Sequence, residues 1–111
     1  MYFKLVIASV ALMCVGVASG RLWSNCYGCY GHSAYDPQAV INCRRFINIT
    51  ERHSCEGYCV FLYGTVIGET ANATLAMRYC SRYHCMFITL HGGVKEHCSD
   101  CEHDYCNTQT Y

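Results

Sequence analysis

The stretch HCSDCEHDYCN, residues 97–107, concentrates residue types that metal sites and hydrolytic enzymes use. Cysteine thiolates and neutral imidazoles are the ligands that zinc prefers. His103 and Asp104 are neighbours, and a paired histidine and aspartate can activate a water molecule in hydrolases. The same cysteines can instead staple the end of a small secreted domain through disulfides. The compartment and the rest of the chain decide between these three kinds of chemistry.

The N-terminal residues predict export. A single positive charge, Lys4, precedes sixteen uncharged residues, 5–20. This run is shorter than the roughly 20 apolar residues that span a membrane, and it fits the apolar region of a signal peptide. Ala18 and Gly20 form a small-residue cleavage site, so we expect cleavage after Gly20, or after Ser19. An uncleaved signal anchor is the alternative. Residues 1–20 are therefore predicted to be a signal peptide and 21–111 a single domain.

The predicted mature chain carries little charge. Loss of Lys4 leaves seven basic and eight acidic residues, a net charge of −1. Nucleic-acid binding needs a clustered basic surface, so this partner is not expected. The final residues CNTQTY are polar, and no hydrophobic segment there signals a glycolipid anchor. We therefore expect a secreted, extracellular protein without a stable membrane anchor.

Cysteine dominates the mature composition. Of the eleven cysteines, Cys14 leaves with the signal peptide, and ten remain. An even, dense set of cysteines in a short exported chain indicates a disulfide scaffold. Complete pairing leaves no free thiol for nucleophilic catalysis. No other catalytic set stands out, so we expect a protein that is not an enzyme and needs no cofactor.

The hydrophobic pattern predicts strands. Residues 59–68 and 74–80 are rich in β-branched and aromatic side chains and are predicted to form a hairpin with a polar tip at 68–73. Residues 86–90 and 94–97 flank Gly92-Gly93 and are predicted to form a second hairpin. A further strand is expected within 39–49. These elements predict a small all-β fold whose loops extend between clusters of cysteines.

The motifs NCYGCY, CEGYC and above all CEHDYCN, where Asn107 directly follows the last cysteine, carry a family resemblance. The chain from Cys26 to Asn107 resembles the three-finger family, which includes snake toxins, urokinase-receptor-type domains and activin-receptor ectodomains. It is also similar to the nematode ET module. One departure is that Ser99 and Asp100 separate two cysteines that three-finger proteins usually place side by side.

The resemblance implies three hairpin fingers that extend from a knot of five disulfides. The implied pairs are Cys26–Cys59, Cys29–Cys43, Cys55–Cys80, Cys85–Cys98 and Cys101–Cys106. It also implies a structural role for Asn107, whose side chain would hydrogen-bond back to the cysteine cluster. His103 and Asp104 would then lie on an exposed loop and be replaceable.

Two other functions remain alternatives. The pairs Cys26/Cys29 and Cys98/Cys101 have the spacing of zinc-ribbon halves, which would make the chain a metal-binding module. CEHDYC also resembles the His-Asp segment of secreted phospholipases A2, although its spacing is one residue short. The disulfide interpretation is favoured over both, so no metal-binding or catalytic residue is predicted.

Two sequons and a few exposed side chains complete the prediction. Asn48 and Asn72 each begin an N-glycosylation sequon and are expected on exposed turns. A secreted domain without catalytic residues is expected to act by binding an extracellular protein or receptor. The candidate contacts are Tyr63 and Phe87 on the fingers, together with the cationic pair Arg44 and Arg45.

Overall fold

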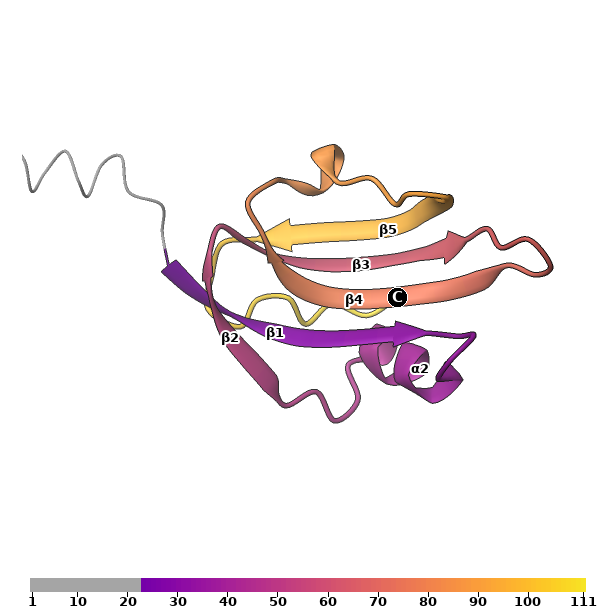
Figure 1. The fold of residues 1–111 in the computed structure, drawn as a ribbon. Coiled ribbons are helices and arrows are strands. Elements are labelled where there is room, and N and C mark those ends of the chain that lie inside the picture. Colours follow the sequence, from indigo (N-terminus) through magenta and orange to yellow (C-terminus); the bar gives the residue numbers. More distant parts are fainter. Residues whose placement is uncertain (1–22) are drawn as a thin grey trace, which may run out of the picture.

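The computed structural model describes residues 23–111, and the predicted signal peptide lies outside them. The elements in chain order are β1 (Trp23–His32), α2 (Pro37–Arg45), β2 (Glu51–Glu56), β3 (Tyr58–Val66), β4 (Ala73–Ser81), the 3₁₀ helix η1 (Cys85–Phe87) and β5 (Gly93–Cys101). The strands form one antiparallel sheet in the order β2-β1-β4-β3-β5 (Figure 1). The prediction of a small, disulfide-rich, mainly β fold is confirmed.

The first predicted hairpin is present as β3 and β4. Its register runs without interruption from the pair Tyr58–Ser81 to the pair Val66–Ala73. β3 lies inside the sheet, between β4 and β5, and its side chains from Val60 to Tyr63 are all buried. A strand buried on both faces reads as a continuous apolar run, which explains why VFLY lacks alternation.

The second predicted hairpin is wrong. Residues 86–90 form no strand, because the segment begins with η1 and continues as an irregular loop. The residues after Gly92 do form a strand, β5, but it pairs with β3 instead of with its sequence neighbour. Gly92 has a positive φ of 68° at the turn before β5, as the glycine pair indicated.

The strand predicted within residues 39–49 is also wrong, because this segment begins with helix α2. Asp36 caps the helix, and its Oδ1 accepts a hydrogen bond from the Ala39 amide at 3.1 Å. Pro37 occupies the first helical turn, where its missing N–H costs nothing. The helix ends where Phe46 adopts a left-handed conformation. Aspartate followed by proline is a helix-start signal as much as a turn signal.

Helix α2 packs on one face of the sheet and builds the main apolar cluster. Its buried Val40 and Cys43, three residues apart, lie on one side of the helix and meet side chains of β3 and β4. The cluster consists of Val40, Cys43, Phe61, Tyr63 and Ala76, with Cys29 packed against it. Gly31 on β1 permits this approach, because a Cβ there would lie 2.4 Å from the Val40 amide nitrogen.

The opposite face of the sheet is partly covered by the loop 82–92. Side chains alternate between faces along a strand, so Leu62 points away from α2, whereas Phe61 and Tyr63 point towards it. Cys98 lies opposite Leu62 in the register and is bonded to Cys85 of the loop. The loop 82–92 and helix α2 therefore lie on opposite faces.

Five disulfides join the strands, and their pairs are the ones that the resemblance implies. They are Cys26–Cys59, Cys29–Cys43, Cys55–Cys80, Cys85–Cys98 and Cys101–Cys106. Three of these disulfides come together at one end of the sheet, where Cys26, Cys55 and Cys59 are fully buried. The remaining two attach α2 to β1 and the loop 82–92 to β5. Helix α2 and the loop 82–92 are thus each covalently tied to the sheet.

Candidate functional site

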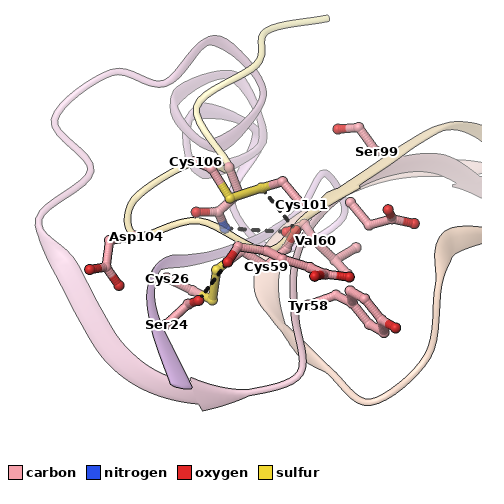
Figure 2. Close-up of a disulfide and its surroundings, with 12 residues drawn as sticks. Ser24, Cys26, Tyr58, Cys59, Val60, Ser99, Cys101, Asp104 and Cys106 are labelled. Carbon is pink, nitrogen blue, oxygen red and sulfur yellow. Dashed lines mark hydrogen bonds between the residues drawn. A yellow bond between two sulfur atoms is a disulfide. The ribbon is translucent and has the colours of Figure 1, made fainter. Parts of the chain in front are cut away.

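The cysteine cluster is the closest approach to a metal site among residues 23–111. The sulfur atoms of Cys26, Cys55 and Cys59 lie within 4.8 Å of one another. Zinc is held by thiolates, however, and each of these sulfurs is engaged in a disulfide. Figure 2 shows the Cys26–Cys59 and Cys101–Cys106 disulfides at this end of the sheet, close to Val60. These three sulfurs are therefore part of a covalent knot and are not available as thiolate ligands.

Asn107 closes this knot through three hydrogen bonds to backbone groups. Its Oδ1 accepts from the Tyr27 amide at 3.0 Å, and its Nδ2 donates to the Tyr27 carbonyl at 2.9 Å. The same Nδ2 also reaches the Val60 carbonyl at 3.4 Å. The side chain is fully buried, so each of these bonds satisfies a polar group that water cannot reach.

The loop that the Cys101–Cys106 disulfide closes is held against β1. Asp104 Oδ1 accepts a hydrogen bond from the Asn25 amide at 2.7 Å, and the Tyr105 amide donates to the Asn25 carbonyl at the same distance. His103 is exposed. Both residues lie on the exposed loop that was expected. Because only Asp104 pairs with a backbone amide, the two are expected to differ in how easily they are replaced. Residues 103 and 104 do not form a histidine–carboxylate pair.

The one histidine–carboxylate pair among residues 23–111 joins His84 to Asp100, with His84 Nδ1 3.4 Å from Asp100 Oδ1. The second carboxylate oxygen accepts from the Cys85 amide at 2.7 Å. The Tyr58 ring packs against the His84 ring in a tilted arrangement, with a centroid distance of 4.0 Å. These contacts fix the start of the loop 82–92 against β3 and β5. The arrangement positions a loop and brings no nucleophile to the imidazole.

The loop 82–92 is anchored at several further points. Besides the Cys85–Cys98 disulfide, Lys95 Nζ donates to the carbonyls of Cys85 at 2.6 Å and of Ile88 at 3.0 Å. The loop nevertheless presents Met86 and Phe87 to solvent, with exposed fractions of 76% and 67%. Large apolar side chains on a well-anchored segment are typical of contact surfaces for other proteins.

Of the four predicted contact residues, Phe87 and Arg45 are exposed, whereas Tyr63 is not. Only 8% of Tyr63 is accessible, because β3 is an inner strand and Arg44 lies over the Tyr63 ring at 4.6 Å. Tyr63 therefore belongs to the core beside α2. Arg44 is half-buried and is occupied by this cation–π contact.

Sequence reasoning missed Arg78, a 1% exposed arginine on β4. Its guanidinium lies 3.9 Å from the centre of the Phe61 ring. It donates to the carbonyls of Cys43 at 2.9 Å and Asn107 at 2.8 Å, and also to those of Arg44 at 3.3 Å and Gln109 at 2.6 Å. Burial lowers the pKa of Arg78 to about 10, so the group remains charged at neutral pH.

Arg78 connects two segments that no disulfide joins directly. Cys43 and Arg44 are in the last turn of α2, where carbonyl groups lack helical partners and the helix dipole is negative. Asn107 and Gln109 belong to the C-terminal segment, which therefore packs beside α2 on the same face of the sheet. A cation with five donors in a planar fork can serve all these carbonyls at once. The sequence signal that could have revealed the burial of Arg78 is an arginine flanked by apolar residues, as in AMRYC.

Both sequon asparagines are exposed and lie between regular elements. Asn48 follows α2 with a positive φ of 54°, and Asn72 immediately precedes β4. The positions agree with the expected turns, and an oligosaccharide at either would meet solvent.

No protein-family model matches the chain, and no curated protein or solved structure is significantly similar to it. No helix of residues 23–111 is long and apolar enough to cross a membrane.

Proposed function

We propose that this chain is a secreted, disulfide-stapled module that binds an extracellular protein through the loop 82–92. The observation that carries the proposal is the exposure of Met86 and Phe87 on a loop that a disulfide, a lysine and an aspartate hold in place. Such a loop loses little conformational entropy on binding, because its backbone is already ordered. The resemblance to three-finger proteins supports the same kind of activity.

The extracellular part of the proposal is supported by the cysteines. All ten cysteines of residues 23–111 are paired, and disulfides of this density are typical of proteins in oxidising compartments. The signal peptide predicted at residues 1–20 would direct the chain to such a compartment. The resemblance suggests receptors and secreted ligands as the class of partner.

Crosslinking capture from extracellular fluid, followed by affinity measurement, tests the proposal. We expect the wild-type protein to capture a specific protein and the variant Met86→Ala/Phe87→Ala to bind it at least tenfold more weakly. Thr89→Ala, an exposed change on the same loop, is the matched control and should bind as wild type. Equal affinity of the double variant and the wild type would contradict the assignment of this surface.

A further inference from the structure

The hydroxyl of Ser54 is the one serine hydroxyl among residues 23–111 that forms no hydrogen bond within this part of the chain. Four other serines are present, and each has a partner: Ser24 the Glu102 carbonyl, Ser33 the Thr74 amide, Ser81 the Tyr83 amide and Ser99 the side chain of Gln109. A hydroxyl that takes part in the fold gives up its hydrogen bond when it is modified. Ser54 is exposed and has no such bond to lose.

Ser54 lies on β2, which is one of the two edge strands of the sheet (Figure 1). On one side β2 pairs with β1, where Ser54 is opposite Asn25. On its other side β2 has no neighbouring strand within residues 23–111, so the backbone groups there lack a strand partner. A segment of this kind can be bound in its extended form by the groove of another protein. The position of Ser54 therefore suits a modifying enzyme that binds an extended segment.

An acidic side chain, Glu56, follows Ser54 at a distance of two positions. Side chains alternate between the faces of a strand, so Ser54 and Glu56 point to the same side of β2. Glu56 is exposed, and the one ion pair of residues 23–111 lies elsewhere, at His84–Asp100. None of the other four serines is followed by an acidic residue at this spacing. A hydroxyl and a carboxylate without partners thus lie side by side along one exposed edge.

A cation, Arg52, precedes Ser54 by two positions on the same face, but it already has partners. Its guanidinium lies 5.3 Å from the centre of the Tyr105 ring and 5.7 Å from that of the Tyr27 ring. An enzyme that recognises a basic residue before the serine would have to draw Arg52 away from these two cation–π contacts. An enzyme that recognises an acidic residue after the serine finds Glu56 unengaged. The structure therefore favours recognition through the acid.

We propose that Ser54 is a phosphorylation site for an ATP-dependent serine kinase of the secretory pathway that recognises the acidic residue two positions after the serine. In the transfer, Ser54 Oγ attacks the γ-phosphorus of ATP. A new Oγ–P bond replaces the bond from this phosphorus to the β–γ bridging oxygen, and ADP leaves. A carboxylate of the kinase takes the hydroxyl proton. The product carries about 1.5–2 negative charges on the exposed side of β2 at neutral pH.

This inference rests on the export that is part of the proposed function, because a kinase of this class meets its substrates in the secretory lumen. It does not rest on the binding of a protein through the loop 82–92. That loop is bonded to β5, which is the edge strand at the other end of the sheet from β2. The two surfaces can therefore be tested separately.

Phosphorylation of the purified, folded protein tests the site. The protein is incubated with Mg²⁺, ATP and a secretory-pathway serine kinase that requires an acidic residue at this spacing, and the phosphate is located by intact mass and peptide mapping. We expect the wild type to take up one phosphate, on Ser54, and Ser54→Ala to take up none. Glu56→Gln should react at least tenfold more slowly. Arg52→Gln, at the same distance on the other side of the serine, is the matched control and should react as the wild type.

The proposal is overturned if the folded wild type takes up no phosphate, if the phosphate lies on another serine instead, or if only the reduced, unfolded chain reacts. It is also overturned if Arg52→Gln slows the reaction and Glu56→Gln does not, since that result indicates recognition of a basic residue. Intact mass before and after reduction confirms five disulfides in each variant. Met86→Ala/Phe87→Ala should be phosphorylated as the wild type, so the result is independent of whether the loop 82–92 binds a protein.

Discussion

Asn107 and the backbone of Tyr27 exchange two hydrogen bonds, one in each direction, across 80 positions of sequence. The asparagine side chain presents a carbonyl oxygen and an N–H in the geometry of a peptide group, so it pairs with β1 as a neighbouring strand would. This one side chain thereby links the C-terminal segment to the first strand without a covalent bond.

Replacement of Asn107 should destabilise the fold. Asn107→Ala leaves the amide and carbonyl of Tyr27 unpaired at a buried position, and we expect a loss of about 1–3 kcal/mol in the free energy of unfolding. Asn107→Asp retains the acceptor but loses the donor and buries a charge, so it should be no better tolerated. Chemical denaturation of the three proteins measures the difference. An Asn107→Ala variant as stable as the wild type would contradict the role of these bonds.

His103 and Asp104 should differ in their effect on stability. Asp104→Ala removes the acceptor of the Asn25 amide and is expected to cost about 1 kcal/mol. His103→Ala changes an exposed side chain and should cost less than about 0.5 kcal/mol. Thermal melts with and without a chelator provide the comparison. A chelator-sensitive melt that His103→Ala abolishes would instead support a metal site.

Arg78 should tolerate neither a shorter cation nor an apolar substitute. Arg78→Lys keeps the charge but cannot reach four carbonyls, and Arg78→Met leaves them all unpaired, so each should cost about 3 kcal/mol or more. Hydrogen exchange at the Tyr111 amide should accelerate in both variants, because the C-terminal segment loses an anchor. Unchanged exchange there would show that Arg78 does not hold this segment.

The pKa of Arg78 also predicts a pH dependence. The folded-state pKa of about 10 lies below the ordinary value of an arginine, so the unfolded state holds the proton more tightly. The cost of burying the charge is therefore constant below pH 10 and falls as the pH rises through 10. The difference in the free energy of unfolding between the wild type and Arg78→Met should accordingly stay constant between pH 5 and pH 8. Chemical denaturation of both proteins across this range measures the difference, and a change with pH would contradict the prediction.

Both sequons should carry glycans when the protein is secreted from a eukaryotic cell. A peptide N-glycosidase is expected to lower the apparent mass in two steps, one each for Asn48 and Asn72, because both side chains are exposed outside regular elements. Asn48→Gln and Asn72→Gln should each remove one step. A secreted protein whose mass the enzyme does not change would contradict this prediction.

The Cys26–Cys59 disulfide should be essential for secretion. It closes a loop with a sequence separation of 33. Without it the unfolded chain gains conformational entropy, so the free energy of unfolding should fall by about 3–4 kcal/mol. Cys26→Ala/Cys59→Ala should therefore fail to accumulate outside the cell. Secretion of the double variant with an unchanged melting temperature would show that this pair does not hold the fold.

The sequence predicted the hairpin of β3 and β4, because its apolar run, polar tip and β-branched residues all act locally. It also predicted a small β fold rich in disulfides, since cysteine density and chain length determine that class. The sequence-based prediction failed where a strand pairs with another strand that is distant in the chain. β5 pairs with β3 across the loop 82–92, and no local pattern distinguishes this arrangement from a hairpin with residues 86–90.

Helix α2 and Arg78 were missed for a related reason. The β-branched residues of AVINCRRF favour a strand by propensity, yet Asp36 and Pro37 start a helix, and the sheet supplies the apolar surface that holds it. Arg78 looks like a solvated residue in an alternating strand. Its burial depends on carbonyls that α2 and the C-terminal segment bring from elsewhere in the chain.

The strand register places cysteines that are not bonded to each other in direct opposition. Cys59 faces Cys80 on β4 and Cys101 on β5, although its sulfur is joined to that of Cys26. During oxidative maturation, a thiolate at any of these positions has several disulfides within reach of attack. The nascent domain should therefore pass through scrambled isomers, and a disulfide isomerase should accelerate its conversion to the native form.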